Sequence, residues 1–463
     1  MNPPMKKYLR LILLIILILL LIPIGYLAIY FPPVMAGMTA KVTCSCVFVM
    51  NRSVESVRAK ELQVFPGLSR AGIEVGSDSS VTAQILWSKS KAIYREGLGC
   101  TLLAERSEED IRGQKFILAK KSTLDQDTIA WPQGDKLNID STFSIDLSRI
   151  NSILDSAFID DPEKPLNTLA VVVVHNGLII GERYAVGFTS KSRMMGWSMG
   201  KSITSALIGI LVRDEKIHVL DGAPIAEWQN DDRKNIRVEN LLQATSGLSW
   251  EEGYFNPRGQ FHEMLMNSDD KGGYAASQKL KNPPGTVFQY SSGTTNILSK
   301  IIREKVGDTS YHQFPYERLF YKIGMNSMMM EPDASGTFVG SSYVFATARD
   351  WARFGLLYLN DGYWLGERIL PEGWAEYTST PSAVAPLGEY GAQWWLNAGE
   401  KDNPSNSVYP NLPPDAYWAD GFEEQYVMVI PSKNLVVVRL GISHHGSPFE
   451  KMVGSIIKCL PEE

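Results

Sequence analysis

The sequence predicts an α+β fold in which helices flank an antiparallel sheet, with a helical region inserted between the first and last strands and a membrane helix at the N-terminus. β-Branched runs occur within residues 168–187 and again within 424–443. Between them, apolar residues recur every three or four positions, as they do in helices. Because the strands come first and last, both ends of the domain are expected to build one sheet.

Composition and charge narrow the class of protein. The chain has 463 residues, of which 44% are hydrophobic, enough for one large domain or two ordinary ones. Lys and Arg total 45 against 51 Asp and Glu, which gives a net charge of -6. The charges are interspersed and form no basic face, so no nucleic-acid partner is expected. An oligomeric state does not follow from these features.

The N-terminus carries a long apolar run. Lys6, Lys7 and Arg10 precede it, and the next charge is Lys41. Residues 11–31 would form a helix of about 31 Å, which is enough to cross a bilayer core. The run is longer than a signal-peptide core and lacks an A-x-A-like cleavage site. We therefore expect a single-pass anchor rather than a signal peptide. The positive-inside rule then places the rest of the chain outside the cytoplasm, in the periplasm of a two-membrane cell.

There are four cysteines: Cys44, Cys46, Cys100 and Cys459. Export permits a disulfide, and Cys100 can pair with either Cys44 or Cys46. The C-S-C pattern offers too few ligands for a zinc site. Cys459 lies near the end of the chain and is expected to be packed.

Three parts follow along the chain. Residues 1–32 form a cytoplasmic tip and transmembrane anchor, 33–140 an N-terminal extension and linker, and 141–463 the main domain. Within the extension, residues 41–50 and 81–94 are strand-like, and the polar, turn-rich stretch 120–135 is typical of a linker.

The main domain opens with a hairpin. His175-Asn176-Gly177 separates two β-branched runs, and Asn-Gly favours a type I′ turn. Helical periods follow, and two strands and a helix close the chain. The expected helices cover 202–217, 238–245, 294–307, 348–362 and 449–460, and the late strands cover 424–431 and 434–443.

Ser198 and Lys201 stand three residues apart at the start of an apolar helix. Residues at this spacing share a helix face, so the amine can reach the hydroxyl. Burial disfavours the ammonium form, and a neutral amine can take the serine proton. The helix N-terminus also adds N–H groups where an oxyanion would form. The alternative is a capping serine with a solvated lysine. The S-x-x-K spacing recurs, without such a setting, at Ser88/Lys91, Ser268/Lys271 and Ser455/Lys458.

Tyr290 precedes Ser292 by two residues, between a Pro-Pro-Gly-Thr turn and an expected helix. A phenol beside a lysine ammonium is more easily deprotonated. We expect Tyr290 to relay a proton to the leaving group. The Y-x-[SN] spacing is not specific, because it also occurs at Tyr254/Asn256, Tyr358/Asn360, Tyr377/Ser379 and Tyr409/Asn411.

Four stretches in order resemble motifs of the serine β-lactamases and penicillin-recognising hydrolases: WSMGKSITSALIG, VENLLQATSGLSW, PPGTVFQYSSGTTNILSKII and SSYVFATARDWARFGLLYLNDGYWLGERILPEGW. The resemblance covers about residues 165–460. It is nearest to class C β-lactamases, D-alanyl-D-alanine carboxypeptidases, and related esterases and 6-aminohexanoate-oligomer hydrolases. It implies a β-lactamase/DD-peptidase-like fold, with Ser198 as nucleophile, Lys201 as base and Tyr290 as proton relay.

The chain departs from that family at its third motif, a K-T-G or H-x-G on a strand lining the cleft. Residues 419–421, Ala-Asp-Gly, are the best counterpart. The resemblance implies that Gly421 and Phe422 border the oxyanion site, where the Phe422 N–H would join that of Ser198. The lost cation argues against recognition of β-lactams and D-alanyl carboxylates. Ser292, where class C enzymes have Asn, argues the same way.

Other residues could border the cleft. Tyr254 could flank it, and Trp395 could line it, although adjacent tryptophans such as Trp394 and Trp395 are more often core residues. His444 and His445 have no acidic partner at metal spacing and are expected to be loop residues.

We therefore expect an enzyme that cleaves a small amide or ester through an acyl-enzyme, with no cofactor and no metal. A D-alanyl-D-alanine carboxypeptidase or β-lactamase remains an alternative. A second alternative is a non-catalytic penicillin-fold protein that binds peptidoglycan or a partner.

Overall fold

Strands from both ends of the main domain meet in one antiparallel sheet, as predicted. The computed structural model describes residues 3–65, 67–137, 145–254 and 256–461. The six-stranded sheet has the order β12-β13-β14-β15-β5-β6. Its early and late halves join where β15 pairs with β5. The strands are β5 (Thr168–His175), β6 (Leu178–Tyr184), β12 (Trp395–Leu396), β13 (Tyr417–Gly421), β14 (Gln425–Ile430) and β15 (Leu435–Gly441).

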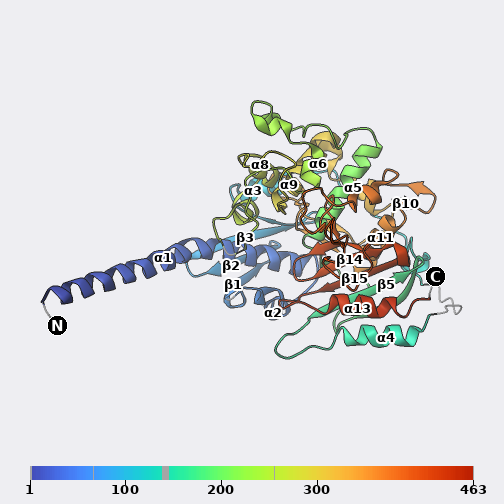
Figure 1. The fold of residues 1–463 in the computed structure, drawn as a ribbon, viewed down its shortest axis with the longest axis horizontal. Helices are drawn as coiled ribbons and strands as arrows, with labels where there is room; N and C mark the ends of the chain where they lie inside the picture. The colour runs from blue at the N-terminus through green and yellow to red at the C-terminus, as the bar shows by residue number, and fades with distance from the viewer. Residues whose placement is uncertain (1–2, 66, 138–144, 255, 462–463) are drawn as a thin grey trace.

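The sheet is covered on both faces, which explains its continuous apolar strands. Every residue of β5, β14 and β15 is buried. Along β5, Val172 and Val174 join the core containing α11 (Ala348–Leu359), whereas Val171 and Val173 join the core on the opposite face. That second face is covered by α4 (Leu147–Ser156) and α13 (Phe449–Ile457), which lie side by side in Figure 1.

The β5–β6 hairpin has the predicted turn. Asn176 and Gly177 both take positive φ angles, 49° and 77°. A type I′ turn requires positive φ at both central positions. Asparagine tolerates this region better than other non-glycine residues, and glycine enters it freely.

The inserted region is mainly helical, and each predicted helix is present within a few residues of its expected limits. Its longer helices are α5 (Met199–Arg213) and α9 (Ser292–Val306), together with α11. The remaining elements are η4 (Ala226–Trp228), η5 (Asp232–Asn235), α6 (Val238–Leu242), α7 (Gln260–His262), η6 (Glu263–Asn267), α8 (Lys271–Ala276), α10 (Asp308–Tyr311), η7 (Tyr316–Phe320), α12 (Trp374–Thr378), and the short strands β7 (Met194–Met195), β8 (Met329–Met330), β9 (Val344–Ala346), β10 (Tyr363–Trp364) and β11 (Glu367–Arg368).

A long helix and a second sheet precede the main domain. Helix α1 (Pro3–Phe48) runs out from the body of the molecule, and its C-terminal part lies against the second sheet (Figure 1). That sheet is antiparallel in the order β1-β2-β3-β4. Strands β2 and β3 confirm the strand expectation at 81–94. The elements are α2 (Val54–Ala59), β1 (Gly72–Gly76), β2 (Ser80–Ile85), β3 (Ser88–Arg95), β4 (Gly99–Leu102) and α3 (Glu108–Gly113).

The strand expected at residues 41–50 is wrong, because α1 continues to Phe48. Alternating polar and apolar residues imitate a strand there. Extending an existing helix adds one hydrogen bond per residue, which costs far less than starting a new element. The polar positions also find partners within the helical form: Ser45 Oγ donates to the Lys41 carbonyl at 3.1 Å.

The expected membrane-spanning anchor is not supported. Nowhere in the described part of the chain does a helix combine the length and hydropathy that crossing a bilayer requires. Positions 20, 23 and 24 of the expected span lie outside the described side chains. Helix α1 has no break at the expected boundary between residues 32 and 33. The other expected boundary, at 140, falls outside the described residues.

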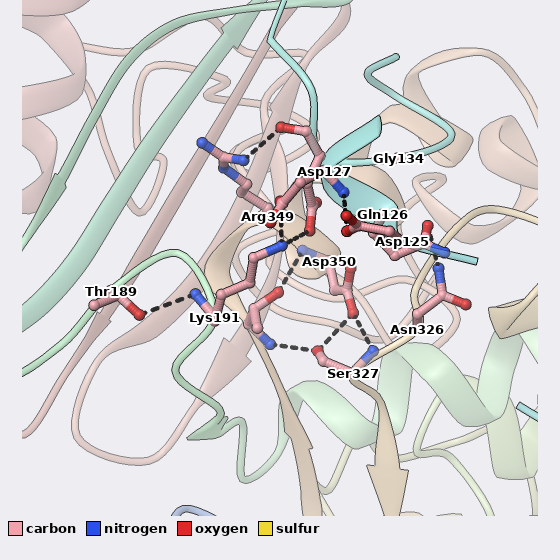
Figure 2. Close-up of polar contacts among 12 residues, drawn as sticks. Asp125, Gln126, Asp127, Gly134, Thr189, Lys191, Asn326, Ser327, Arg349 and Asp350 are labelled. Carbon is pink, nitrogen blue, oxygen red and sulfur yellow. Dashed lines mark hydrogen bonds and ion pairs between the residues drawn. The ribbon is translucent and has the colours of Figure 1, made fainter. Parts of the chain in front are cut away.

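The stretch 120–135 is fastened to the main domain by ion pairs. Lys191 Nζ donates to Asp127 at 2.6 Å and to Asp135 at 2.7 Å, and Figure 2 shows Lys191 reaching toward this stretch. Arg353 pairs with the same Asp135 carboxylate at 2.7 Å. A polar cavity of about 930 Å³ opens beside these residues, and none of the predicted site residues lines it.

One disulfide ties α1 to the second sheet. Cys44 pairs with Cys100 of β4, which confirms one of the two pairings that the sequence left open. Cys46 and Cys459 are free thiols. The bridge closes a loop with a sequence separation of 56 and so limits the unfolded chain.

Removing this bridge should destabilise the protein strongly. For a loop of this length, we expect Cys44→Ala to lower the free energy of unfolding by about 4 kcal/mol. The buried but unpaired Cys46 provides the control: Cys46→Ala should cost clearly less. The measurement is denaturant unfolding, with alkylation and intact mass to count free thiols. Equal losses for the two variants, or four alkylated thiols without reductant, would contradict the bridge.

Candidate functional site

Ser198 sits at the first turn of α5, and its side chain does not cap the helix. It is the N-cap residue of the helix, yet its hydroxyl makes no capping hydrogen bond. The preceding Trp197 has a φ of 47°, a strained angle for a tryptophan. Such strain is typical of functional sites. Gly200 lets α5 approach closely, since a Cβ there would lie 2.5 Å from the Gly340 carbonyl oxygen. These features exclude the capping interpretation of Ser198.

Lys201 is buried, with 2% of its surface exposed, and points at Ser198. Its Nζ lies 2.9 Å from Ser198 Oγ, 3.1 Å from Ser292 Oγ and 3.1 Å from the Ser341 carbonyl oxygen. Burial lowers the pKa of Lys201 to about 8, although Glu252 and Asp420 act in the opposite direction. An appreciable neutral fraction therefore exists near neutral pH. A solvated lysine is excluded.

Tyr290 completes a three-residue cluster. Its ring centroid lies 4.8 Å from Lys201 Nζ, and its side chain interacts with that of Ser198. The expected ease of deprotonation is wrong. Burial, and then the neighbouring Tyr390 and Glu252, raise the pKa of Tyr290 well above its ordinary value. Tyr290 is therefore a neutral phenol, which can accept one proton while it donates another.

Ser292 joins this cluster to a carboxylate that the sequence analysis missed. Glu252 accepts a short hydrogen bond from Ser292 Oγ and another from the Ser292 backbone N–H at 2.9 Å. Trp250 Nε1 donates to the same carboxylate at 2.5 Å. Ser292 is 1% exposed, so it is positioned to orient Lys201 rather than to meet a substrate. The only sequence signal was the acidic pair at 251–252, just before Tyr254.

The end of β13 lies against the segment that carries the nucleophile. A Cβ on Gly421 would meet the Gly196 carbonyl oxygen at 2.3 Å, so the two backbones touch. The Phe422 ring then meets Trp197 edge-on, at 5.8 Å between centroids. This strand carries Asp420 where the related motif has its polar residue. Burial raises the pKa of Asp420 to about 7, against the opposing effect of Lys201.

Two predicted aromatic residues border the cluster on different sides. The Tyr254 ring lies 5.4 Å from that of Phe422. Trp395 lies 5.3 Å from the Tyr290 ring and is half-buried. Its neighbour Trp394 is fully buried in the core, as adjacent tryptophans often are.

The other S-x-x-K copies do not form serine–lysine pairs. Lys91 binds the carboxylates of Asp78 and Glu108. Lys271 donates to the Ser268 carbonyl at 2.9 Å rather than to its hydroxyl. The hydroxyl of Ser455 instead donates to a backbone carbonyl one helical turn earlier.

His444 has an acidic partner that the sequence did not reveal. Its Nδ1 lies 2.8 Å from Glu423 Oε1, and this carboxylate raises the pKa of His444. The pair remains too small for a metal site. Within the described residues, no three His, Cys, Asp or Glu side chains come together as metal ligands.

A sequence profile of the Beta-lactamase family matches residues 155–452. The chain belongs to this family. It is therefore an enzyme of the β-lactamase-related serine hydrolases, which cleave amides or esters. A curated relative, the 6-aminohexanoate-dimer hydrolase of Paenarthrobacter ureafaciens, is 25% identical over 263 residues, which are 51% of this chain and 66% of that one.

Solved structures of the β-lactamase-related hydrolases share the fold. A Bacillus anthracis protein titled a 6-aminohexanoate-dimer hydrolase superposes with a TM-score of 0.53 at 27% identity, covering 64% of this chain and 81% of that one. A family VIII carboxylesterase gives a TM-score of 0.55 at 14% identity, covering 68% and 97%. The second likeness concerns the fold alone.

Titration of Lys201 should govern the reactivity of Ser198. Only the neutral amine can accept the serine proton, and the pKa of Lys201 is lowered to about 8. We expect the rate of Ser198 labelling by a fluorophosphonate probe to rise with pH and to level off above about pH 8. Mass spectrometry identifies the labelled residue. A rate that is independent of pH would contradict this prediction.

Glu252 should shift that profile. Its negative charge raises the pKa of Lys201, so Glu252→Gln should move the acid limb to lower pH. The adjacent, exposed Glu251 provides a matched control, because Glu251→Gln removes the same charge without touching Ser292. A similar shift in both variants, or a shift to higher pH in Glu252→Gln, would show that Glu252 does not act through this network.

Proposed function

We propose that the protein hydrolyses an amide or ester through an acyl-enzyme on Ser198. The observation that carries the proposal is the 2.9 Å contact between Ser198 Oγ and Lys201 Nζ, in surroundings that lower the pKa of the amine to about 8. A buried amine with a depressed pKa, hydrogen-bonded to a serine hydroxyl, is an arrangement that activates a serine nucleophile.

In the first half of the reaction, Lys201 takes the Ser198 proton as Oγ attacks the substrate carbonyl. We infer that the backbone N–H groups of Ser198 and Phe422 stabilise the oxyanion. Both residues border one pocket, which supports this inference. The protonated Lys201 then gives a proton to the Tyr290 hydroxyl, which donates its own proton to the leaving amine or alcohol as the bond between that group and the carbonyl carbon breaks. In the second half, water adds to the acyl-enzyme with the same proton route reversed, which releases the acid and free Ser198.

The charges at β13 separate this proposal from the antibiotic and peptidase alternatives. Recognition of a β-lactam or D-alanyl carboxylate by this strand needs a cation, whereas the strand carries Asp420. The similarity to a curated aminohexanoate-dimer hydrolase supports an amide substrate. The non-catalytic alternative does not account for a buried Lys201 and Tyr290 around one hydroxyl.

Three substitutions test the mechanism. Ser198→Ala should abolish the acyl-enzyme, and Lys201→Met should leave the hydroxyl unactivated. Tyr290→Phe should slow turnover by about 10²–10⁴-fold, as the loss of a general acid–base step does. Because the residues act as one unit, the triple variant should be little worse than Ser198→Ala. The measurement is kcat/KM across p-nitrophenyl esters, nitrocefin, D-Ala-D-Ala peptides and aminohexanoate dimer.

Matched serine variants provide the control for those substitutions. Ser88→Ala and Ser455→Ala carry the same change in S-x-x-K copies that form no pair, and both should keep nearly full activity. A fully active Ser198→Ala protein, or an adduct on another residue, would contradict the proposed nucleophile.

We propose further that the N-terminal run holds the chain at a membrane, with the hydrolase domain outside the cytoplasm. The basic residues before the run support this orientation. The exposed apolar side chains of α1, such as Leu11 at 53% and Ile22 at 63%, support contact with a membrane. The Cys44–Cys100 disulfide favours an oxidising compartment.

Reporter fusions test the location. Alkaline phosphatase at the C-terminus should be active and a cytoplasmic fluorescent reporter silent. The reverse pattern would contradict this location. Recovery of a mature form lacking residues 1–40 would point to a cleaved signal peptide instead of an anchor.

A further inference from the structure

A small apolar pocket, of about 40 Å³, opens beside the nucleophile. Ser198 lies in its wall, next to Trp197, Phe422 and Tyr343. None of the described residues that line this pocket is Asp, Glu, Lys or Arg. Its histidine, His262, adds no charge at neutral pH, because burial lowers its pKa below the ordinary value. A charged group placed here would lose its hydration without gaining a counter-ion, so the pocket favours an uncharged apolar group.

One wall of this pocket comes from α1, far outside the part of the chain that matches the family. Met38 and Val42 both line it. They are four residues apart and therefore lie on one face of the helix. Val42 is 3% exposed. The helix packs against Met266, another lining residue: a Cβ on Gly37 would lie at an ordinary contact distance, 3.4 Å, from its sulfur.

A buried polar cluster fixes α1 in this position. Lys41, one residue before Val42, makes a short ion pair with Glu331. The Cys100 backbone N–H donates to the same carboxylate at 2.6 Å, and Cys100 is disulfide-bonded to α1. Lys41 Nζ also lies 3.7 Å from the ring centroid of Tyr343, which lines the pocket. The Lys41–Glu331 ion pair and the Cys44–Cys100 disulfide thus both hold α1 in the pocket wall.

The positions of the proton-transfer residues decide which part of a substrate enters. A proton relay must lie beside the leaving atom. Tyr290 and Lys201 do not line the pocket, whereas Ser198 does. The leaving group must then lie toward Tyr290, and the acyl side of the scissile carbonyl faces the pocket.

We propose that the substrate carries an uncharged, apolar acyl chain and that Met38 and Val42 of α1 set its length. This inference rests on the proposed hydrolysis at Ser198. It names the substrate class within it: esters or amides of simple aliphatic acids, rather than acids with an ammonium or carboxylate at the far end.

The test is a chain-length series of p-nitrophenyl esters, from acetate to decanoate, on the full-length enzyme. We expect kcat/KM to rise about four-fold per added methylene until the pocket is filled, as burial of each CH₂ predicts, and then to fall. The 6-aminohexanoyl ester should be poorer than the hexanoyl ester. A flat series, or preference for the 6-aminohexanoyl ester, would overturn the proposal.

Variants of α1 give the sharper measurement. Val42→Phe should shorten the preferred chain, so that kcat/KM falls more for the longer esters than for acetate, and Met38→Ala should lengthen it. Leu27→Phe, on the exposed part of the same helix, is the matched control and should leave the profile unchanged. If Val42→Phe fails to fold, Met38→Ala alone decides. An unchanged chain-length optimum in Met38→Ala would overturn the role of α1.

Failure of this inference can be told apart from failure of the proposed function. If Ser198→Ala abolishes hydrolysis but the unsubstituted enzyme shows no chain-length dependence, the acyl-pocket proposal fails and the assignment of Ser198 as nucleophile stands. If hydrolysis persists in Ser198→Ala, the proposed function itself fails.

Discussion

The site depends on burying one amine. An ammonium group in a low-dielectric interior is costly unless its hydrogens are bonded or its charge is lost. At Lys201 both happen in part. Its Nζ donates hydrogen bonds to Ser198 Oγ, Ser292 Oγ and the Ser341 carbonyl oxygen, and burial lowers the pKa of Lys201 to about 8. The three partners come from α5, α9 and the segment before β9. These elements must meet for the lysine to be buried, so the packing of the helical region and the reactivity of Ser198 have one physical origin.

A second buried lysine is handled differently. Lys41 keeps a carboxylate partner in Glu331, with Ser45 and the Cys100 amide completing the bonds of that carboxylate. Burial lowers the pKa of Lys41 and raises that of Glu331, whereas their attraction opposes both shifts. A buried pair of this kind tolerates the loss of neither partner. The chain thus buries one lysine against the Ser198 hydroxyl and another against a carboxylate that helps to hold α1 at the pocket.

The sequence predicted what local patterns encode. Asn176-Gly177 determines its own turn, the apolar runs give the strands on both sides, and the helix start at Ser198 puts Lys201 within reach. It could not predict what only tertiary packing brings together. Glu252 meets Ser292 across forty positions of the chain. His444 meets Glu423 across the open end of the hairpin formed by β14 and β15. The neutral state of Tyr290 follows from burial, which no spacing reveals. The α1 extension through residues 41–48 overrode a strand-like alternation because an adjoining helix was already formed.

The pocket wall contributed by α1 also has a meaning for how enzymes of this kind diverge. The reacting groups lie within residues 155–452, yet Met38 and Val42 lie before that match begins. Substitutions in the N-terminal helix can therefore redirect which acid is released while every reacting side chain stays the same. Two enzymes descended from one gene could therefore differ in acyl specificity through changes in a segment that lies outside an alignment of the shared domain.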